Sequence, residues 1–257
     1  MTEEVYNARK GLRRSELWEM RKTPSHFQYH INNPEKDTDA LRIGRAVHMA
    51  ILQPKMFKKA FVAPSESWGD LRTKEGKEKK AAFLASVPEG AEVLTFSEME
   101  QVKAMQHAVR TKCIDLLRDT QREYSVFWKD PATGIDCKAR FDAWKPGTII
   151  DIKTAEKADT DHFIRASLEY GYHLQAAFYR AGAIYAKQDL DPDFIFIVIE
   201  KNPPYAVHVM KAGDSFIITG ETLMQDLMFK LKECQESKSW PDYETDELNP
   251  IGGRWAL

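Results

Sequence analysis

The chain has 257 residues, of which 43% are hydrophobic and 30% are charged, enough apolar material for the core of one large domain. No apolar run approaches the roughly 18 residues needed to span a bilayer, and the N-terminus lacks the basic start and apolar stretch of a signal peptide. The composition therefore excludes a membrane protein and predicts a cytoplasmic one. The net charge of −2 does not mark a nucleic-acid binder, but it is compatible with a local basic surface.

The cysteines carry information about the compartment. Cys113, Cys137 and Cys234 are odd in number and widely spaced. This pattern favours reduced thiols in a cytoplasm and argues against a disulfide framework or a zinc knuckle.

Residues 1–120 are expected to be mainly helical. A basic cluster at residues 9–14 is explained more simply by a solvated helix face than by a contact with nucleic-acid phosphates. A short helix is predicted to begin at Ser25, and a longer one covers residues 39–52 and ends before a proline. In that longer helix His48 lies one turn after Gly44. Glycine inside a helix costs about 1 kcal/mol relative to alanine, so close packing is expected at Gly44.

A polar and basic segment, residues 68–77, leads into the next predicted helix. It contains Arg72, Lys74 and Lys77, and a charged surface loop and a phosphate-binding element explain it equally well. We expect Ser97 to cap a long helix that ends near Leu117.

The second half of the chain is expected to contain a sheet. Strands are predicted at residues 122–128, 137–144 and 148–154, joined by turns that contain Pro or Gly. Asp142 and Asp151 then lie on neighbouring strands. Because side chains alternate along a strand, Lys153 shares a face with Asp151. Two carboxylates in need of a counter-charge form a natural site for Mg²⁺, although an Asp-x-Lys pair alone is more often a solvated ion pair.

The rest of the chain is predicted to contain two helices, two strands and a final helix. Helices are predicted at residues 159–169 and from residue 172 onward, where Gln175 and Tyr179 share one face. Residues 193–200 are the most apolar strand and are expected to be central and buried. An edge strand at 205–210 and a final helix at 213–237 precede a tail that contains Trp240 and Trp255.

Three elements follow one another in the second half of the chain: Asp142, then Asp151-Ile152-Lys153, then Gln175-x-x-x-Tyr179. This order resembles that of the PD-(D/E)XK nuclease superfamily in its RecB-like and RecE-like branch. The upstream Gly44-x-x-x-His48 element resembles the same branch. The closest resemblance is to RecE-type phage and prophage exonucleases (the exonuclease VIII type), from about residue 24 to the tail. The chain differs in using Asp151 where Glu is common elsewhere in the superfamily, and Phe141-Asp142 where the motif has Pro-Asp, and neither change removes a ligand.

The resemblance implies an α/β fold, with a PD-(D/E)XK core built on a central mixed β-sheet flanked by helices. Residues 1–120 would form the helical N-terminal part and residues 121–257 the nuclease core, as one structural domain overall. It also implies one or two Mg²⁺ ions, with Mn²⁺ able to substitute. The implied metal ligands are Asp142, Asp151, His48 and the Ile152 carbonyl.

The remaining implied site residues serve catalysis and DNA binding. Lys153 would orient or deprotonate the nucleophile, Gln175 would orient Lys153 or the attacking water, and Tyr179 would contact a phosphate. Glu123 is a further catalytic candidate. The DNA-binding candidates are Arg72, Lys74 and Lys77, together with Lys138 and Arg140. By strand alternation Lys138 and Arg140 lie on the same face as Asp142, but they could equally form an exposed cationic rim.

In function, the resemblance implies digestion of double-stranded DNA from 5′ ends, which leaves 3′ single strands for a RecT-type annealing partner. It implies a ring-shaped homo-oligomer, a trimer or tetramer, in a bacterial cytoplasm. The alternatives are an endonuclease of the same fold and a catalytically inactive DNA-binding protein. An iron–sulfur nuclease is disfavoured by the scattered cysteines, and a helical scaffold leaves the acidic hairpin unexplained.

Overall fold

The computed structural model describes residues 1, 3–33, 38–187 and 189–243. Helices dominate the first 117 residues, with one short parallel strand pair between them. In chain order these elements are α1 (Glu3–Ala8), α2 (Arg14–Glu19), α3 (Pro24–Asn32), α4 (Asp39–Leu52), α5 (Pro54–Ala60), β1 (Phe61–Val62), α6 (Lys74–Ala85), β2 (Glu92–Val93) and α7 (Phe96–Leu117).

The second half contains a sheet of five strands in the order β3-β4-β5-β6-β7 within the described residues. The first three strands form an antiparallel meander, β6 is parallel to β5, and β7 pairs antiparallel at the edge. The parallel pair needs a crossover, which two helices provide. The elements are β3 (Gln121–Lys129), β4 (Asp136–Lys145), β5 (Thr148–Ala155), α8 (Thr160–Tyr170), α9 (Tyr172–Lys187), β6 (Asp193–Glu200), β7 (Val207–Lys211) and α10 (Asp214–Ser237). This mixed sheet flanked by helices confirms the predicted fold class.

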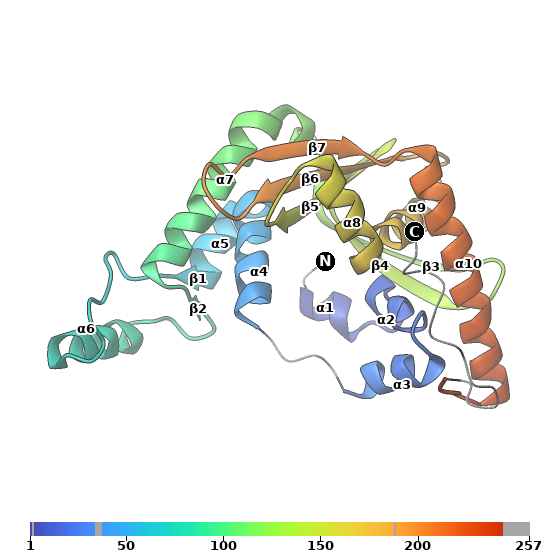
Figure 1. The fold of residues 1–257 in the computed structure, drawn as a ribbon, viewed down its shortest axis with the longest axis horizontal. Coiled ribbons are helices and arrows are strands. Elements are labelled where there is room, and N and C mark those ends of the chain that lie inside the picture. Colours follow the sequence, from blue (N-terminus) through green and yellow to red (C-terminus); the bar gives the residue numbers. More distant parts are fainter. Residues whose placement is uncertain (2, 34–37, 188, 244–257) are drawn as a thin grey trace, which may run out of the picture.

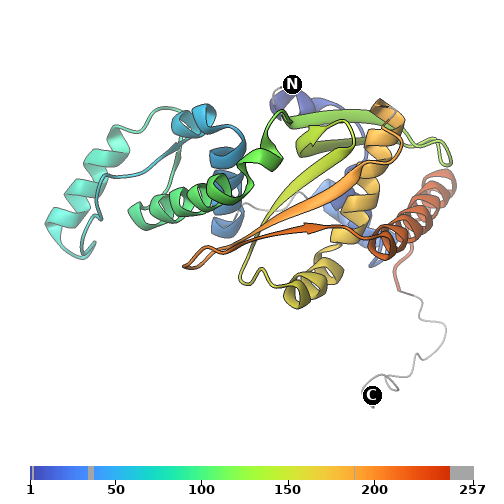
Figure 2. The same cartoon turned by 90° about the horizontal axis from the view of Figure 1, so that it is seen from above.

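The sheet is covered on both faces, so it separates two apolar cores (Figures 1 and 2). On one face Ile149 and Phe194 pack with residues of α9 and α10. On the other, Ile150 and Ile152 pack with residues of α4 and α7. Successive residues of β5 enter different cores, as strand alternation requires. The N-terminal helices therefore contribute to both cores, α2 and α3 to the first and α4, α5 and α7 to the second.

Most of the predicted helices have a capping side chain at their N-terminus, but the predicted cap of one helix is wrong. The start of α7 is Phe96, and its cap is Thr95 rather than Ser97. The Thr95 hydroxyl accepts the Glu98 backbone N–H at 3.1 Å, and the Glu98 carboxylate accepts the Thr95 N–H at 2.7 Å. This reciprocal capping box satisfies two N–H groups that the helix itself cannot bond.

Helix α6 belongs to an arm that stands off from the body of the protein (Figures 1 and 2). The parallel pair β1–β2 lies at its base. The arm packs largely on itself, with the Trp68 and Phe83 rings 6.2 Å apart and the Lys80 ammonium 5.2 Å from the centre of the Trp68 ring. Its basic residues are consequently displayed away from the two cores.

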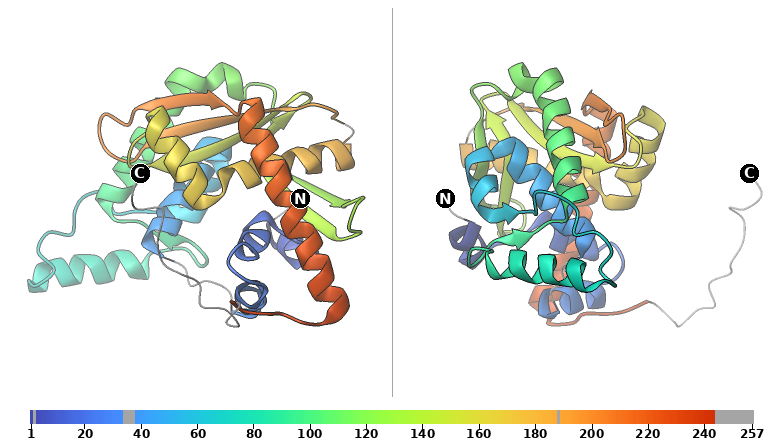
Figure 3. Two further views of the ribbon diagram at one scale, coloured as in Figure 1. Left: turned by 45° about the vertical axis from the view of Figure 1, so that its right-hand side comes forward. Right: turned by 90° about the vertical axis from the view of Figure 1, so that its left-hand side faces the viewer.

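The last helix, α10, runs from the sheet towards α2 and α3, across the long axis of the molecule (Figures 1 and 3). Beyond it, Trp240 stacks on Phe27 with ring centres 5.6 Å apart. The other tryptophan of the predicted tail, Trp255, lies outside the described residues. None of the described helices combines the length and apolar character needed to cross a bilayer.

The prediction that Gly44 in α4 is closely packed is wrong. A Cβ placed on Gly44 would meet no heavy atom within 4 Å. Among the described residues, no packing contact requires a glycine at this helix-interior position, so its small size is not explained by the fold.

A glycine is required at the junction of α8 and α9. Gly171 has φ +69°, in the left-handed region that ends many helices, and a Cβ there would lie 2.6 Å from the Trp18 ring. Helix α2 therefore packs directly on the turn that leads into α9.

We predict that Gly171→Ala destabilises the fold more than Gly134→Ala. Gly134 also has a positive φ, +75°, but a Cβ there meets nothing within 4 Å, so its substitution measures backbone strain alone, about 1–2 kcal/mol. Gly171→Ala adds the clash with Trp18, about 1–3 kcal/mol more. Urea denaturation of both variants gives the difference, and equal losses would mean that Trp18 moves aside at no cost.

Candidate active site between strands β4 and β5

The backbone pairing of β4 with β5 stops where the two aspartates meet. The ladder joins Lys145 to Thr148, Trp144 to Ile149 and Ala143 to Ile150. Asp142 and Asp151 come next in this register, but their backbones are not paired. Instead the Ile152 N–H donates to Asp142 Oδ2 at 2.7 Å. A side chain thus replaces a strand partner, and the strands separate around two carboxylates.

A histidine from helix α4, on one side of the sheet, stabilises the charged form of Asp142. His48, from α4, places Nδ1 3.3 Å from Asp142 Oδ2. Burial raises the pKa of Asp142, but the charges of His48 and Lys153 and the bond from Ile152 outweigh it, so the pKa lies below its ordinary value. Burial lowers the pKa of His48, yet the charge of Asp142 and its hydrogen bond raise it overall. The two groups therefore favour a charged pair.

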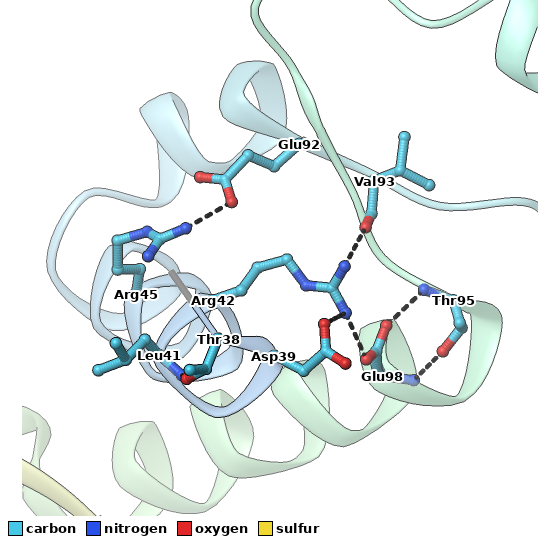
Figure 4. Close-up of polar contacts among 9 residues, drawn as sticks. All are labelled: Thr38, Asp39, Leu41, Arg42, Arg45, Glu92, Val93, Thr95 and Glu98. Atoms are coloured by element: carbon cyan, nitrogen blue, oxygen red, sulfur yellow. Dashed lines mark hydrogen bonds and ion pairs between the residues drawn. The ribbon is translucent and has the colours of Figure 1, made fainter. Parts of the chain in front are cut away.

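The helix that carries His48 is fixed at its other end by arginine contacts (Figure 4). Arg42 donates to Glu98 Oε1 at 2.7 Å and to the Val93 carbonyl at 3.3 Å. Arg45, one turn further along, bonds Glu92 at 2.7 Å. Helix α4 is thereby attached to β2 and to the start of α7, at the base of the arm.

Asp151 is the more deeply buried carboxylate, with 2% of the residue exposed. Gln175 Nε2, from α9, donates to Asp151 Oδ1 at 2.6 Å. Lys153 Nζ lies 2.7 Å from Asp151 Oδ2, but this ion pair lacks the direction of a hydrogen bond, so Oδ2 is buried without a hydrogen-bond partner. Burial raises the pKa of Asp151, and the nearby Asp142 charge adds to the rise while Lys153 opposes it.

Lys153 lies between the acidic pair and an aromatic ring. Its ammonium is 4.7 Å from the centre of the Tyr172 ring, and 17% of its side chain is exposed. A cation over a ring face is attracted by the negative charge of the ring's π electrons. The predicted group of Asp142, Asp151, Lys153 and Gln175 is therefore brought together in space, with Tyr172 as an additional neighbour.

Arg14 joins this group although the sequence did not identify it. One guanidinium nitrogen donates to the Tyr170 carbonyl at 3.0 Å, and another lies 3.4 Å from Gln175 Oε1. Because arginine only donates, it selects the oxygen of the Gln175 amide and directs the nitrogen towards Asp151. Arg14 belongs to the basic cluster that we interpreted as a solvated face, and no local pattern marks a contact across 161 positions.

Tyr179 and Glu123 flank the site. The Tyr179 ring packs between Phe141, at 5.3 Å, and Phe194, at 6.2 Å, and burial raises the pKa of its hydroxyl. Glu123 lies opposite Asp142 in the β3–β4 register, where the ladder has a gap, with φ +50°. Its carboxylate pairs with Arg140 Nε at 3.2 Å. Such a backbone angle is unfavourable for a non-glycine residue and is concentrated at functional sites.

Two of the predicted DNA-binding residues have structural partners instead. Lys138 is 4% exposed, and its ammonium donates to the carbonyls of Tyr6, at 3.1 Å, Asn7, at 3.3 Å, and Arg9. The expectation for Lys138 is therefore corrected: the side chain caps the end of α1 and is not available to a phosphate. Arg140 is also engaged, through its pair with Glu123 and a bond to the Met1 carbonyl, so a free cationic rim does not form there.

The other three DNA-binding candidates lie on the arm. Arg72 pairs with Asp70 at 2.8 Å, and Lys74 lies 3.7 Å from Glu78. Lys77 is exposed on the same helix. These cations are accessible, but in Figures 1 and 2 the arm stands apart from strands β4 and β5, which carry the two carboxylates.

The donor set at the strand opening fits a hard divalent cation. It offers two carboxylates and an imidazole, and the buried Asp151 Oδ2 lacks a hydrogen bond. Within the described residues, however, no three His, Cys, Asp or Glu side chains form a group ready to hold a metal ion. His48 and Asp142 are in contact, whereas Asp151 is paired with Lys153. Metal binding by these residues and the Ile152 carbonyl therefore stays a proposal.

Comparisons with known proteins agree with this fold. A family model described as a PDDEXK-like domain of unknown function (DUF3799) matches residues 14–249. No curated protein matches the chain. A candidate exonuclease from Eubacterium rectale has a similar structure, with a TM-score of 0.63, 14% identity, and coverage of 98% of this chain and 96% of that chain. At this identity the likeness concerns the fold.

An alkaline exonuclease from Laribacter hongkongensis was also found, at 13% identity, with coverage of 76% of this chain and 97% of that one. Its TM-score of 0.31 is too low to support an argument. The family match covers most of the chain, and the sheet, the acidic pair and the lysine occur in the expected order. The chain therefore belongs to the PDDEXK-like family DUF3799 and has the fold of the PD-(D/E)XK nuclease superfamily.

Proposed function

We propose that the protein is a metal-dependent deoxyribonuclease that hydrolyses double-stranded DNA from its ends. The observation that carries this proposal is the convergence of Asp142, Asp151, Lys153 and Gln175 at the opening between β4 and β5. Family membership and the shared fold support a nuclease of the PD-(D/E)XK type.

The side chains have separable roles in this chemistry. A divalent cation such as Mg²⁺, or Mn²⁺ in its place, would supply Lewis acidity and lower the pKa of a water molecule. Asp142 and Asp151 would hold it, with His48 and the Ile152 carbonyl. Lys153 would orient the attacking water and offset the negative charge that develops on the phosphate. Gln175 holds Asp151 in place through its 2.6 Å bond.

The finer parts of the proposal rest on the resemblance to RecE-type exonucleases. They are 5′-to-3′ digestion, 3′ tails that a RecT-type annealing protein uses, and a ring-shaped homo-oligomer in a bacterial cytoplasm. Arg72, Lys74 and Lys77 on the arm are proposed to contact DNA phosphates, and Tyr179 and Glu123 stay candidates beside the carboxylates.

We predict that Lys153→Ala lowers DNA cleavage at least about 100-fold, because a positioned charge and proton carrier are lost. The assay uses linear duplex DNA labelled at the 5′ or the 3′ end, with Mg²⁺ or with a chelator. Release of the 5′ label only with metal is the expected result. Lys187→Ala is the matched control, since Lys187 also lies over aromatic rings, 5.2 Å from that of Tyr124, and it should cleave normally.

Other outcomes of this assay have clear meanings. Cutting of closed circular DNA would identify an endonuclease of the same fold. Duplex binding without cutting in any metal would contradict the proposal and leave a DNA-binding protein.

We predict that Arg14→Met raises the Mg²⁺ concentration for half-maximal cleavage by about tenfold, because Asp151 loses the arginine that orients its amide partner. Arg14→Lys should recover only part of this loss, since one ammonium does not reproduce the bridging guanidinium. Arg21→Met is the control, because Arg21 stacks on Trp18, at 4.2 Å, without a contact to Gln175. A loss of thermal stability with an unchanged Mg²⁺ midpoint would assign Arg14 a purely structural role.

We predict that Gly44→Ala moves stability and activity in opposite directions. The added methyl group has open space and removes the glycine penalty, so unfolding should cost about 1 kcal/mol more. Gly44 lies one turn from His48, and we propose that DNA approaches the helix there, so cleavage should weaken. Urea denaturation and the end-label assay measure the two effects, and unchanged cleavage would contradict the proposed approach of DNA.

A further inference from the structure

A cavity of about 300 Å³ adjoins Lys153 on the side away from β4. It lies between the end of β5, the loop that follows and helix α8, and the start of α9 closes it. Neither the acidic pair nor Gln175 lines this cavity. Lys153 is therefore shared between the proposed catalytic group and a separate pocket, whose walls include Lys157, Arg165, Glu169, Tyr170 and Tyr172.

Aromatic rings form one wall of the pocket. Tyr172 has its ring face covered by the Lys153 ammonium at 4.7 Å and packs against Phe163 at 5.7 Å. Tyr170 lies beside it, with ring centres 5.9 Å apart, and is 52% exposed. Tyr170 is thus held by its neighbour but leaves ring surface open for a flat, aromatic ligand.

The charges around the pocket favour an anion. Lys201 is paired with Glu156 at 3.1 Å, and His162 with Asp159 at 2.8 Å. In the part of the chain that the structure describes, Lys157 and Arg165 have no ion-pair partner, and both are exposed at the rim. The remaining acidic group is Glu169. Two cations are therefore available to a phosphate, next to the positive Lys153.

We propose that this pocket binds a nucleoside monophosphate unit, with the base stacked on Tyr170 and the phosphate near Lys157 and Arg165. The inference rests on the proposed function, because the bound unit would be the last nucleotide of the DNA strand that is cut. The volume lies at the lower end of the ~300–1,000 Å³ of small-molecule sites. It admits one nucleotide separated from its partner strand and excludes a duplex. Such a pocket selects DNA ends, where a terminal base unpairs at low cost.

Direct binding tests the pocket without any cleavage. Deoxyadenosine 5′-monophosphate, deoxyadenosine and inorganic phosphate are titrated by calorimetry in the presence of a chelator, so that no metal at Asp142 and Asp151 holds the phosphate. The monophosphate should bind more tightly than either part alone. Tyr170→Ala should weaken it about tenfold, within the range of lost base stacking. Tyr185→Ala is the matched control, as Tyr185 is 51% exposed on α9 and does not line the pocket, and it should bind normally.

The same proteins are then assayed on linear duplex DNA with a normal or an abasic 5′-terminal nucleotide. The wild type should cut the abasic end more slowly, and Tyr170→Ala should remove this preference. Cleavage without any binding of the monophosphate would overturn the pocket but leave the nuclease intact. Binding that Tyr170→Ala leaves unchanged would also overturn it. Tyr170-dependent binding in a protein that cuts no DNA would support the nucleotide site and refute the nuclease.

Discussion

The bond from the Ile152 N–H to the Asp142 carboxylate is the interaction on which the site depends. A continuous ladder between β4 and β5 would bring the backbones together and leave little space for two carboxylates. With a side chain in place of the backbone partner, the strands part and both acids face the opening. Buried carboxylates are costly without partners, so the surrounding elements must supply them. Helix α4 gives His48 and α9 gives Gln175, and both are held at fixed positions by the two cores.

The two carboxylates are not equivalent, and the difference has a physical cause. Burial raises the pKa of Asp142, but the charge and hydrogen bond of His48, the charge of Lys153 and the Ile152 N–H outweigh it, so the pKa is lowered overall. Asp151 is buried more deeply beside a like charge, so its pKa is raised even with Lys153 next to it. Neighbouring acids with pKa values pushed apart are typical of sites that act on protons or cations. Additional positive charge at Asp151 would relieve this imbalance, which is consistent with the proposed metal.

Sequence reasoning predicted the features that depend on local order. Strand alternation placed Lys153 beside Asp151, and turn residues placed Asp142 on the neighbouring strand, as the structure confirms. Sequence reasoning failed where contacts between segments far apart in the chain determine the surroundings of a side chain. Lys138 has the predicted strand face, but the end of α1 covers it. The contact of Arg14 with Gln175 joins segments far apart in sequence. Close packing was predicted at Gly44, yet the space beside it is open. Helical spacing alone does not show what covers a helix.

The junction of α8 and α9 connects the acidic pair with the neighbouring pocket. Arg14 binds the last carbonyl of α8 and the amide of Gln175, and Trp18 packs on Gly171 between them. The same short segment carries Tyr170 and Tyr172, which line the pocket beyond Lys153. A shift of α2 would therefore move the partner of Asp151 and the pocket wall together. In the proposed arrangement, a terminal nucleotide with its base on Tyr170 and its phosphate near Lys157 and Arg165 would place the bond to the next nucleotide beside Lys153, which borders both the pocket and the acidic pair.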